Sequence, residues 1–283
     1  MISPSVLFLG ILLPALIAGA VSWFCGRGRG EERGARPFLG ALSLGLGYLI
    51  AHYSIVGAPA IPSSAVTVPA VDWIAWFVLG ALLLAPLRGL EGAGRWVNAL
   101  YVAFFCVLSF RFPLAHVLPN DLSGLAIRFA LTLVMYVVWN SSDRLAERLR
   151  GPALPAAWAV AGTGIAVSAL FLHMASIAQL TGAVCAGLGA VALVGLFDRG
   201  ARCAEGVIAV ALIVFAGALV NAAIYDLPRV AIVLFVVALV APWVATRAPF
   251  QDRPLLATTV AKLAALVPTA IATYLAYRSG HLE

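Results

Sequence analysis

Residues 254–277 read PLLATTVAKLAALVPTAIATYLAY, an apolar stretch long enough to cross a lipid bilayer as one α-helix. The stretch contains Lys262, the only lysine of the chain, whereas every other Lys-or-Arg position is an arginine. On a helical wheel the polar residues fall on one side, here called the polar seam, which consists of Thr258, Lys262, Thr269 and Thr273 with Ala265 and Ala276. Because lipid cannot hydrogen-bond such side chains, we expect the polar seam to face protein or a water-filled cavity.

The composition of the whole chain is typical of an integral membrane protein. Of 283 residues, 63% are hydrophobic and 11% charged, and the mean hydropathy is +1.03. Soluble domains carry about 25% charged residues, so the composition excludes an ordinary soluble protein. The net charge of +6 comes from arginines scattered through short connections, without a basic stripe. We therefore expect the lipid bilayer, and not nucleic acid, as the partner of this charge.

A helix needs about 20 apolar residues to cross the bilayer, and this length predicts ten spans in the chain. They are residues 3–25, 37–56, 71–87, 96–113, 122–141, 153–173, 176–197, 204–224, 227–246 and 254–277. The expected fold is an all-α integral membrane protein, a bundle of about ten transmembrane helices in one polytopic domain, 1–283.

The charges between these spans predict an orientation. Arginines occupy every second connection, whereas the alternate connections are expected to hold Asp72, Asp121 and Asp226. The positive-inside rule then puts the arginine-bearing connections in the cytoplasm and both termini outside, in a bacterial cytoplasmic (inner) membrane. Ten spans also allow two inverted halves of five, although residues 1–142 and 143–283 share no convincing similarity.

Lys262 has two interpretations. It lies about 12 Å along its helix from Pro254, so its stem could reach back to the cytoplasmic interface. Alternatively it contacts a substrate anion or a lipid headgroup, or acts as a proton-linked amine, with Thr258, Thr269 and Thr273 beside it. No aspartate or glutamate is expected deep in any span, which disfavours coupling to protons or sodium through a buried acid.

A second candidate site lies in the expected hairpin of the fourth and fifth spans. Arg111 ends one span, Arg128 lies about 10 Å into the next, and Asp121 lies in their connection. These groups form either an ion pair that locks the hairpin or an outward-facing site for a carboxylate or phosphate.

The remaining polar residues of the outer side form an expected outer polar cluster. Its members are His52, His116, His173, Gln179 and Asp121. Histidines at span ends either sit at the interface or ligate a metal or haem. Because no ligand spacing such as HxxxH occurs, we predict no metal site, no cofactor and no catalytic residue.

The seventh span is rich in small residues. Gly182 with Ala186, and Ala183 with Gly187, have the small-xxx-small spacing that lets membrane helices approach closely. This face, through Gly182, Ala186 and Gly187, is a candidate contact for a membrane partner or for a second copy of the chain.

Three functional hypotheses remain. The first is a non-enzymatic small-solute carrier with its site around Lys262, and the second is a membrane-embedded subunit or scaffold of a larger complex. The third is an outer-face enzyme acting on a lipid-linked or quinone substrate, which the absence of nucleotide, metalloprotease and hydrolase motifs weighs against. A carrier should keep an accessible pocket at the polar seam, whereas a subunit should bury the seam or the small-residue face against a partner.

Overall fold

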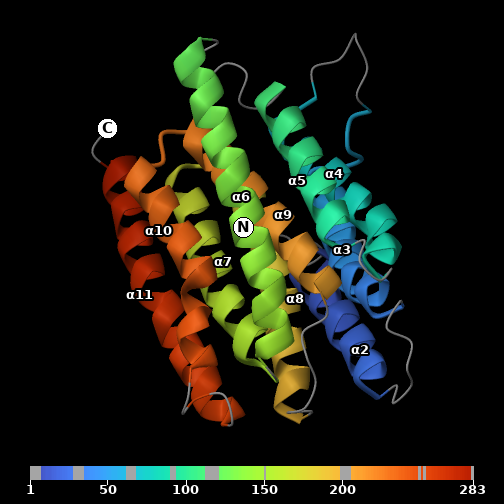
Figure 1. The fold of residues 1–283 in the computed structure, drawn as a ribbon. Coiled ribbons are helices and arrows are strands. Elements are labelled where there is room, and N and C mark those ends of the chain that lie inside the picture. The colour runs from blue at the N-terminus through green and yellow to red at the C-terminus, as the bar shows by residue number, and fades with distance from the viewer. Residues whose placement is uncertain are drawn as a thin grey trace.

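The computed structural model describes residues 8–27, 35–61, 68–89, 94–111, 121–149, 151–197, 205–247, 250 and 253–281. Figure 1 shows helices that run roughly side by side along one axis, with no strand in the ranges just given. In chain order the elements are the π-helical turn η1 (Phe8–Leu12), α2 (Leu13–Arg27), α3 (Ala35–Ile55), α4 (Ala70–Leu84), the 3₁₀ turn η2 (Ala85–Gly89), α5 (Gly94–Arg111), α6 (Leu122–Arg148), α7 (Ala153–Phe171), α8 (Ala175–Phe197), α9 (Glu205–Ile224), α10 (Arg229–Val240), the 3₁₀ turn η3 (Ala241–Thr246) and α11 (Pro254–His281).

The helical and apolar character of the chain supports an α-helical membrane protein with several spans. Within the described residues, seven helical segments are long and apolar enough to cross a membrane, namely Ala70–Leu87, Leu122–Arg148, Ala153–Phe171, Ala175–Phe197, Gly206–Ile224, Arg229–Thr246 and Leu255–His281. Three shorter apolar segments are Phe8–Phe24, Leu39–Ile55 and Trp96–Val107. Each of these ten segments overlaps one of the ten expected spans, while the number that crosses the bilayer stays a prediction.

Helix bounds differ from the expected spans where proline or polar contacts intervene. α4 and α10 each give way to a 3₁₀ turn next to Pro86 and Pro242, because proline lacks the N–H that an α-helix needs and clashes with the preceding turn. α6 instead continues beyond the expected end at residue 141 to Arg148. Its polar last turns are tied to α5, where Asn98 Nδ2 donates to Asp143 Oδ2 at 2.6 Å.

α9 forms the centre of the bundle. It packs against α3, α4, α6, α7, α8 and α10, and every residue from 206 to 215 is buried. Phe215 in α9 contacts the ring of Trp158 in α7, with centroids 6.4 Å apart. The indole Nε1 of Trp158 donates to Leu239 O of α10 at 3.0 Å, so one buried side chain joins three helices.

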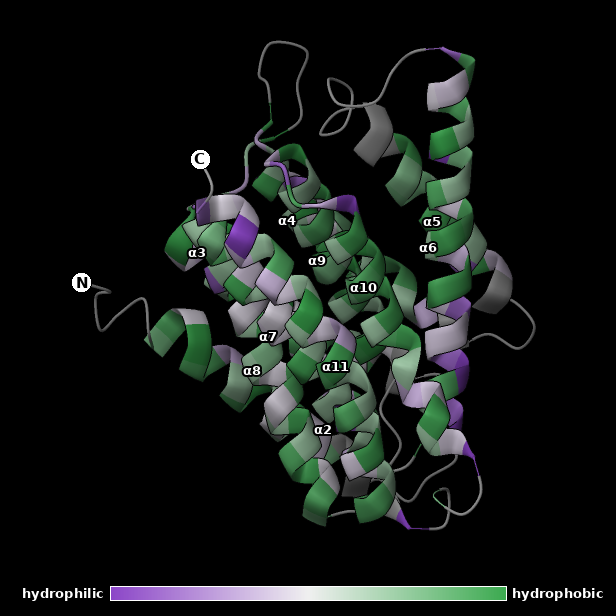
Figure 2. Ribbon diagram, turned by 90° about the vertical axis from the view of Figure 1, so that its left-hand side faces the viewer, coloured by the Kyte–Doolittle hydropathy of each residue, from purple (hydrophilic) through white to green (hydrophobic). Residues whose placement is uncertain are grey.

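α5 and α6 form a hairpin beside this body, as Figure 2 shows. The hairpin is held where Tyr101 packs on Trp139, with ring centroids 5.6 Å apart, and where Asn98 bonds Asp143. Most of the side chains from residue 122 to residue 134 are exposed and apolar. In a membrane such a surface is expected to meet lipid.

The bundle has two chemically different ends. The arginine end carries Arg148, Arg247 and Arg253, and there the Arg148 guanidinium lies 5.1 Å from the ring centroid of Trp243. The opposite end, here called the histidine end, carries the tight turns after α7 and α9. In these turns His173 and Asp226 have φ values of 60° and 62°, in the left-handed region. Ser279 near the end of α11 donates to Asp226 O at 3.3 Å, which brings the last helix to the same end.

Candidate functional site

A groove between α7 and α11 is the first candidate site. It has a volume of about 530 Å³ and opens to the outside of the bundle. Its walls are Ala159, Val160, Thr163, Gly164 and Val167 of α7 and Leu266, Thr269, Ala270 and Thr273 of α11. In Figure 2, α7 and α11 lie side by side.

Gly164 sets how closely the two helices approach. A Cβ atom at this position would collide with Cγ2 of Thr269 and lie 3.1 Å from Oγ1 of Thr273. The groove therefore has its present shape because residue 164 has no side chain.

The structure divides the polar seam predicted from the helical wheel. Thr269 and Thr273 line the groove, and Thr258 is buried at 6% exposure. Lys262 is exposed and lies four residues before Leu266, one helical turn toward the arginine end on the groove side of α11. The seam thus comprises buried threonines, groove hydroxyls and an exposed amine rather than one polar pocket.

The groove hydroxyls already have partners in the protein. Thr163 Oγ1 donates to Ala159 O and Thr269 Oγ1 donates to Ala265 O, both at 2.7 Å. Thr273 Oγ1 reaches across from α11 to Gly164 O of α7 at 3.4 Å. Because these protons point at backbone carbonyls, the groove offers a ligand mainly methyl and methylene surface.

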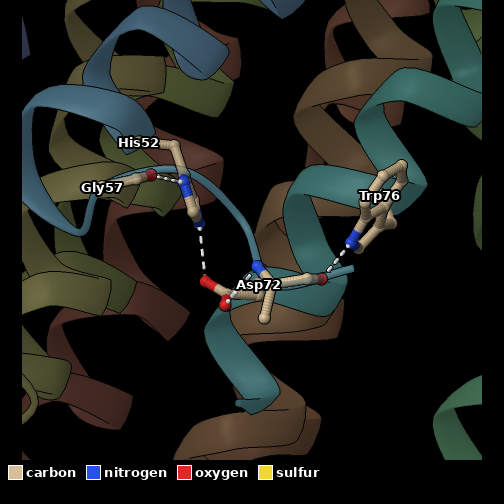
Figure 3. Close-up of polar contacts among 5 residues, drawn as sticks. His52, Gly57, Asp72 and Trp76 are labelled. Atoms are coloured by element: carbon tan, nitrogen blue, oxygen red, sulfur yellow. Dashed lines mark hydrogen bonds and ion pairs between the residues drawn. The ribbon is translucent and has the colours of Figure 1, made fainter. Parts of the chain in front are cut away.

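A second candidate site lies at the histidine end between α3 and α4. His52 Nε2 lies 3.2 Å from Asp72 Oδ1, and the side chains are 1% and 6% exposed. Figure 3 shows that the other ring nitrogen of His52 faces the carbonyl of Gly57, at 3.3 Å. Asp72 Oδ2 in turn accepts the N–H of Ala60 at 3.0 Å, so the pair fastens the segment after α3.

The hydrogen-bonding chemistry of this pair is restricted. Both ring nitrogens of His52 face oxygen atoms, and the Gly57 carbonyl can only accept a hydrogen bond. His52 Nε2 and Asp72 Oδ1 lie within ion-pair distance, and neither atom has a hydrogen-bond partner among the described residues. Tyr48, one turn earlier in α3, lies beside them with its ring centroid 6.1 Å from that of His52.

The expectation that Asp72 belongs to a connection between spans is wrong. Asp72 lies in the first turn of α4 and is buried, with 4% exposure. The chain returns over this turn, because Ala60 binds Asp72 through its N–H and accepts the indole N–H of Trp76 at 2.9 Å (Figure 3). A carboxylate therefore lies inside the protein, near the end of a span and not at its middle.

The other members of the expected outer polar cluster lie elsewhere. His173 is exposed in the turn after α7, and Gln179 lies in α8 and is half-buried. Asp121 is the N-cap of α6 and accepts from the Ser123 hydroxyl at 2.7 Å and from the Gly124 N–H at 2.9 Å. Among the described residues, no ion pair or hydrogen bond joins His52 to any of these three side chains. His116 lies outside the described residues.

The two arginines of the predicted anion site lie in the α5–α6 hairpin. Arg128 is half-buried on α6 and its carbonyl accepts a hydrogen bond from Thr132 Oγ1 at 2.8 Å. Arg111 is the last residue of α5, and its side chain lies outside the described part of the structure.

The small-residue face of α8 is divided between internal packing and open surface. A Cβ atom on Gly187 would meet Leu44 and Ala18 of the same chain, so this glycine serves the packing of α8 on α2 and α3. A Cβ atom on Gly182 or Gly189 would meet nothing within 4 Å. Ala186 lies between these two glycines on the same side of the helix and is half-buried.

Two features of these sites had weak signals in the sequence. Thr163 is a polar residue and Gly164 a small residue in an apolar span. Many membrane helices contain such residues without forming a groove. The burial of Asp72 depends on the return of residues 57–61 over α4, and no local pattern predicts that path.

Among the described residues, no group of three or more His, Cys, Asp or Glu side chains is arranged to hold a metal ion. In comparisons with known proteins, no family model, no curated protein and no solved structure matches this chain.

Proposed function

We propose that the protein is a small-solute carrier whose ligand site is the groove between α7 and α11. The observation that carries the proposal is the position of Thr269 and Thr273 in the groove wall, with Lys262 exposed one turn away on the same side of α11. A laterally open groove with an apolar wall suits a ligand that reaches it from the bilayer, so the expected ligand is amphipathic rather than strongly hydrated.

The proposed topology follows from the positions of the arginines. The chain is proposed to form one domain over 1–283, with ten spans, both termini outside and the arginine end in the cytoplasm of a bacterium. The distribution of arginines supports this orientation. Two inverted halves of five spans remain compatible with it.

The test is uptake into proteoliposomes. Purified protein is reconstituted and offered a panel of isotope-labelled small organic anions and amphipathic solutes. Thr163→Trp fills the groove, whereas Leu133→Trp adds the same side chain on an exposed surface of α6. We expect uptake of at least one solute by the native protein and by Leu133→Trp, and its loss with Thr163→Trp. Equal uptake by both variants would contradict a carrier that uses this groove.

A membrane-embedded subunit is the second candidate, and the open surface at Gly182 and Gly189 favours it. Native mass spectrometry of protein gently extracted from its own membrane tests this alternative. A stoichiometric partner that is lost in Gly182→Leu would favour a subunit. A bare monomer with an intact α8 face would favour the carrier.

A further inference from the structure

The polar atoms of the groove leave little for a hydrated ligand to bind. Thr163 and Thr269 donate to carbonyls of their own helices, and Thr273 turns toward Gly164 O. The inference below rests on the proposed function only in that both assign a ligand to the same groove. A hydrocarbon chain gains from such a wall by filling it, and it leaves no hydrogen bond unmade.

Lys262 carries a positive charge one helical turn from the groove. Lys262 is exposed, and neither α7 nor α11 contains an acidic residue that could neutralise it. Among the described residues, no ion pair to Lys262 is present. An ammonium group about 12 Å along a membrane helix is costly unless it meets water or an anion.

The geometry of α11 connects the charge with the apolar wall. The groove residues of this helix begin at Leu266, one turn after Lys262, and continue to Thr273, about 10 Å further along the axis. Lys262 lies on the side of the groove that faces the arginine end, where Arg253 is also exposed. A lysine stem can extend toward that interface while its methylenes cover apolar surface.

From these relationships we propose that the groove binds one acyl chain of an anionic phospholipid from the leaflet at the arginine end, with the lipid phosphate paired to Lys262. The phosphate neutralises the ammonium group through charge-assisted hydrogen bonds, and the acyl chain follows the methyl-lined wall toward Thr273. The positive charges of the arginine end hold the headgroup of such a lipid at the correct depth.

The experiment measures lipid retention by native mass spectrometry. The full-length protein is reconstituted in nanodiscs that contain equal amounts of phosphatidylglycerol and phosphatidylcholine with matched acyl chains, then released and weighed. We expect one retained phosphatidylglycerol, preferred over phosphatidylcholine by about fivefold. Lys262→Met should abolish the preference, and Lys262→Arg should keep it. Thr163→Trp should remove the retained lipid altogether.

Matched controls separate this site from general attraction to a basic protein. Arg278→Met removes an exposed cation at the opposite end of α11 and should leave the preference unchanged. Equal retention of both lipids by the native protein, or an undiminished preference in Lys262→Met, would overturn the proposal. Displacement of the retained mass by inorganic phosphate would assign the site to a free anion and would also overturn it.

The outcome also distinguishes the two proposals. Lipid retention with the expected variant pattern, but without uptake of any solute, would keep the lipid site and remove the carrier. Uptake that Thr163→Trp blocks, without selective lipid retention, would keep the groove as a carrier site and remove the lipid as its occupant.

Discussion

His52 and Asp72 form a buried pair across α3 and α4, with 3.2 Å between the ring Nε2 and the carboxyl Oδ1. The pair also fixes the chain after α3, because Gly57 O faces the ring and the Ala60 N–H binds the carboxyl group. It joins two helices and their connection at the histidine end, so its principal effect is expected on stability.

The first prediction concerns this pair. His52→Ala or Asp72→Ala should lower the free energy of unfolding by about 3 kcal/mol, because each leaves a buried polar partner uncompensated. The double variant should cost less than the sum of the two single variants, as expected for directly coupled groups. Reversible unfolding in mixed micelles measures the free energy of unfolding of the native protein, the two single variants and the double variant. His281→Ala, at an exposed position, serves as the control, and strictly additive losses would show that the pair is not coupled.

The second prediction concerns the close approach of α7 and α11. Gly164→Ala should destabilise the protein by about 1–3 kcal/mol, because the new methyl group collides with Cγ2 of Thr269. Thr269→Ser removes that methyl group and keeps the hydroxyl, so combining it with Gly164→Ala should recover much of the loss. Thermal unfolding of the purified protein measures both effects.

Gly182→Ala is the matched control for this substitution. Its Cβ atom meets nothing within 4 Å, so helix propensity alone should make it neutral or more stable by up to about 1 kcal/mol. Similar losses for the changes at 164 and 182 would argue against a specific clash between α7 and α11.

The third prediction uses the left-handed residue in the turn after α7. His173 has a φ of 60°, and Met174 N donates to Ala169 O at 2.8 Å in the hydrogen-bond pattern of a glycine-type helix end. His173→Gly should therefore raise stability by up to about 1 kcal/mol through relief of backbone strain. Gly151, with a φ of 63°, provides the reverse test. Gly151→Ala should lower the melting temperature. A lower melting temperature for His173→Gly than for the native protein would refute the strain argument.

The fourth prediction is a pH dependence at the start of α6. The Ser123 hydroxyl, and then the Gly124 N–H, lower the pKa of the exposed Asp121 carboxyl from its ordinary value. A lowered folded-state pKa means that the cap stabilises the helix above the unfolded-state pKa, and that this contribution is lost as the pH falls through the folded-state pKa. The protection of the Gly124 and Leu125 amides against hydrogen exchange, taken relative to the intrinsic exchange rate at each pH, should therefore fall in the native protein on acidification.

Asp121→Asn is the control for this pH dependence. Asparagine caps helices about as well as aspartate but does not titrate in this range, so exchange in the variant should lack the acidic step. An identical acidic step in both proteins would exclude the Asp121 carboxyl as its source.

Much of the helical architecture could be read from the order of residues alone. Each expected span overlaps an apolar helical segment, because an apolar run of sufficient length must satisfy its backbone internally in lipid. The side of α11 that turns inward was visible too, since Thr258, Ala265, Thr269 and Ala276 are all buried.

The tertiary structure decided what each polar residue meets. The helical wheel places Lys262 and Thr269 on the same side of α11. Lys262 is nevertheless exposed whereas Thr269 is buried, because the neighbouring α7 covers only part of that side. Asp72 appeared to be a connection residue, and it is buried because residues 57–61 fold back over α4. The sequence by itself determined the apolar helices, since hydropathy and backbone hydrogen bonding are local. The groove and the His52–Asp72 pair depend on contacts between segments distant in the chain, which only the packed structure supplies.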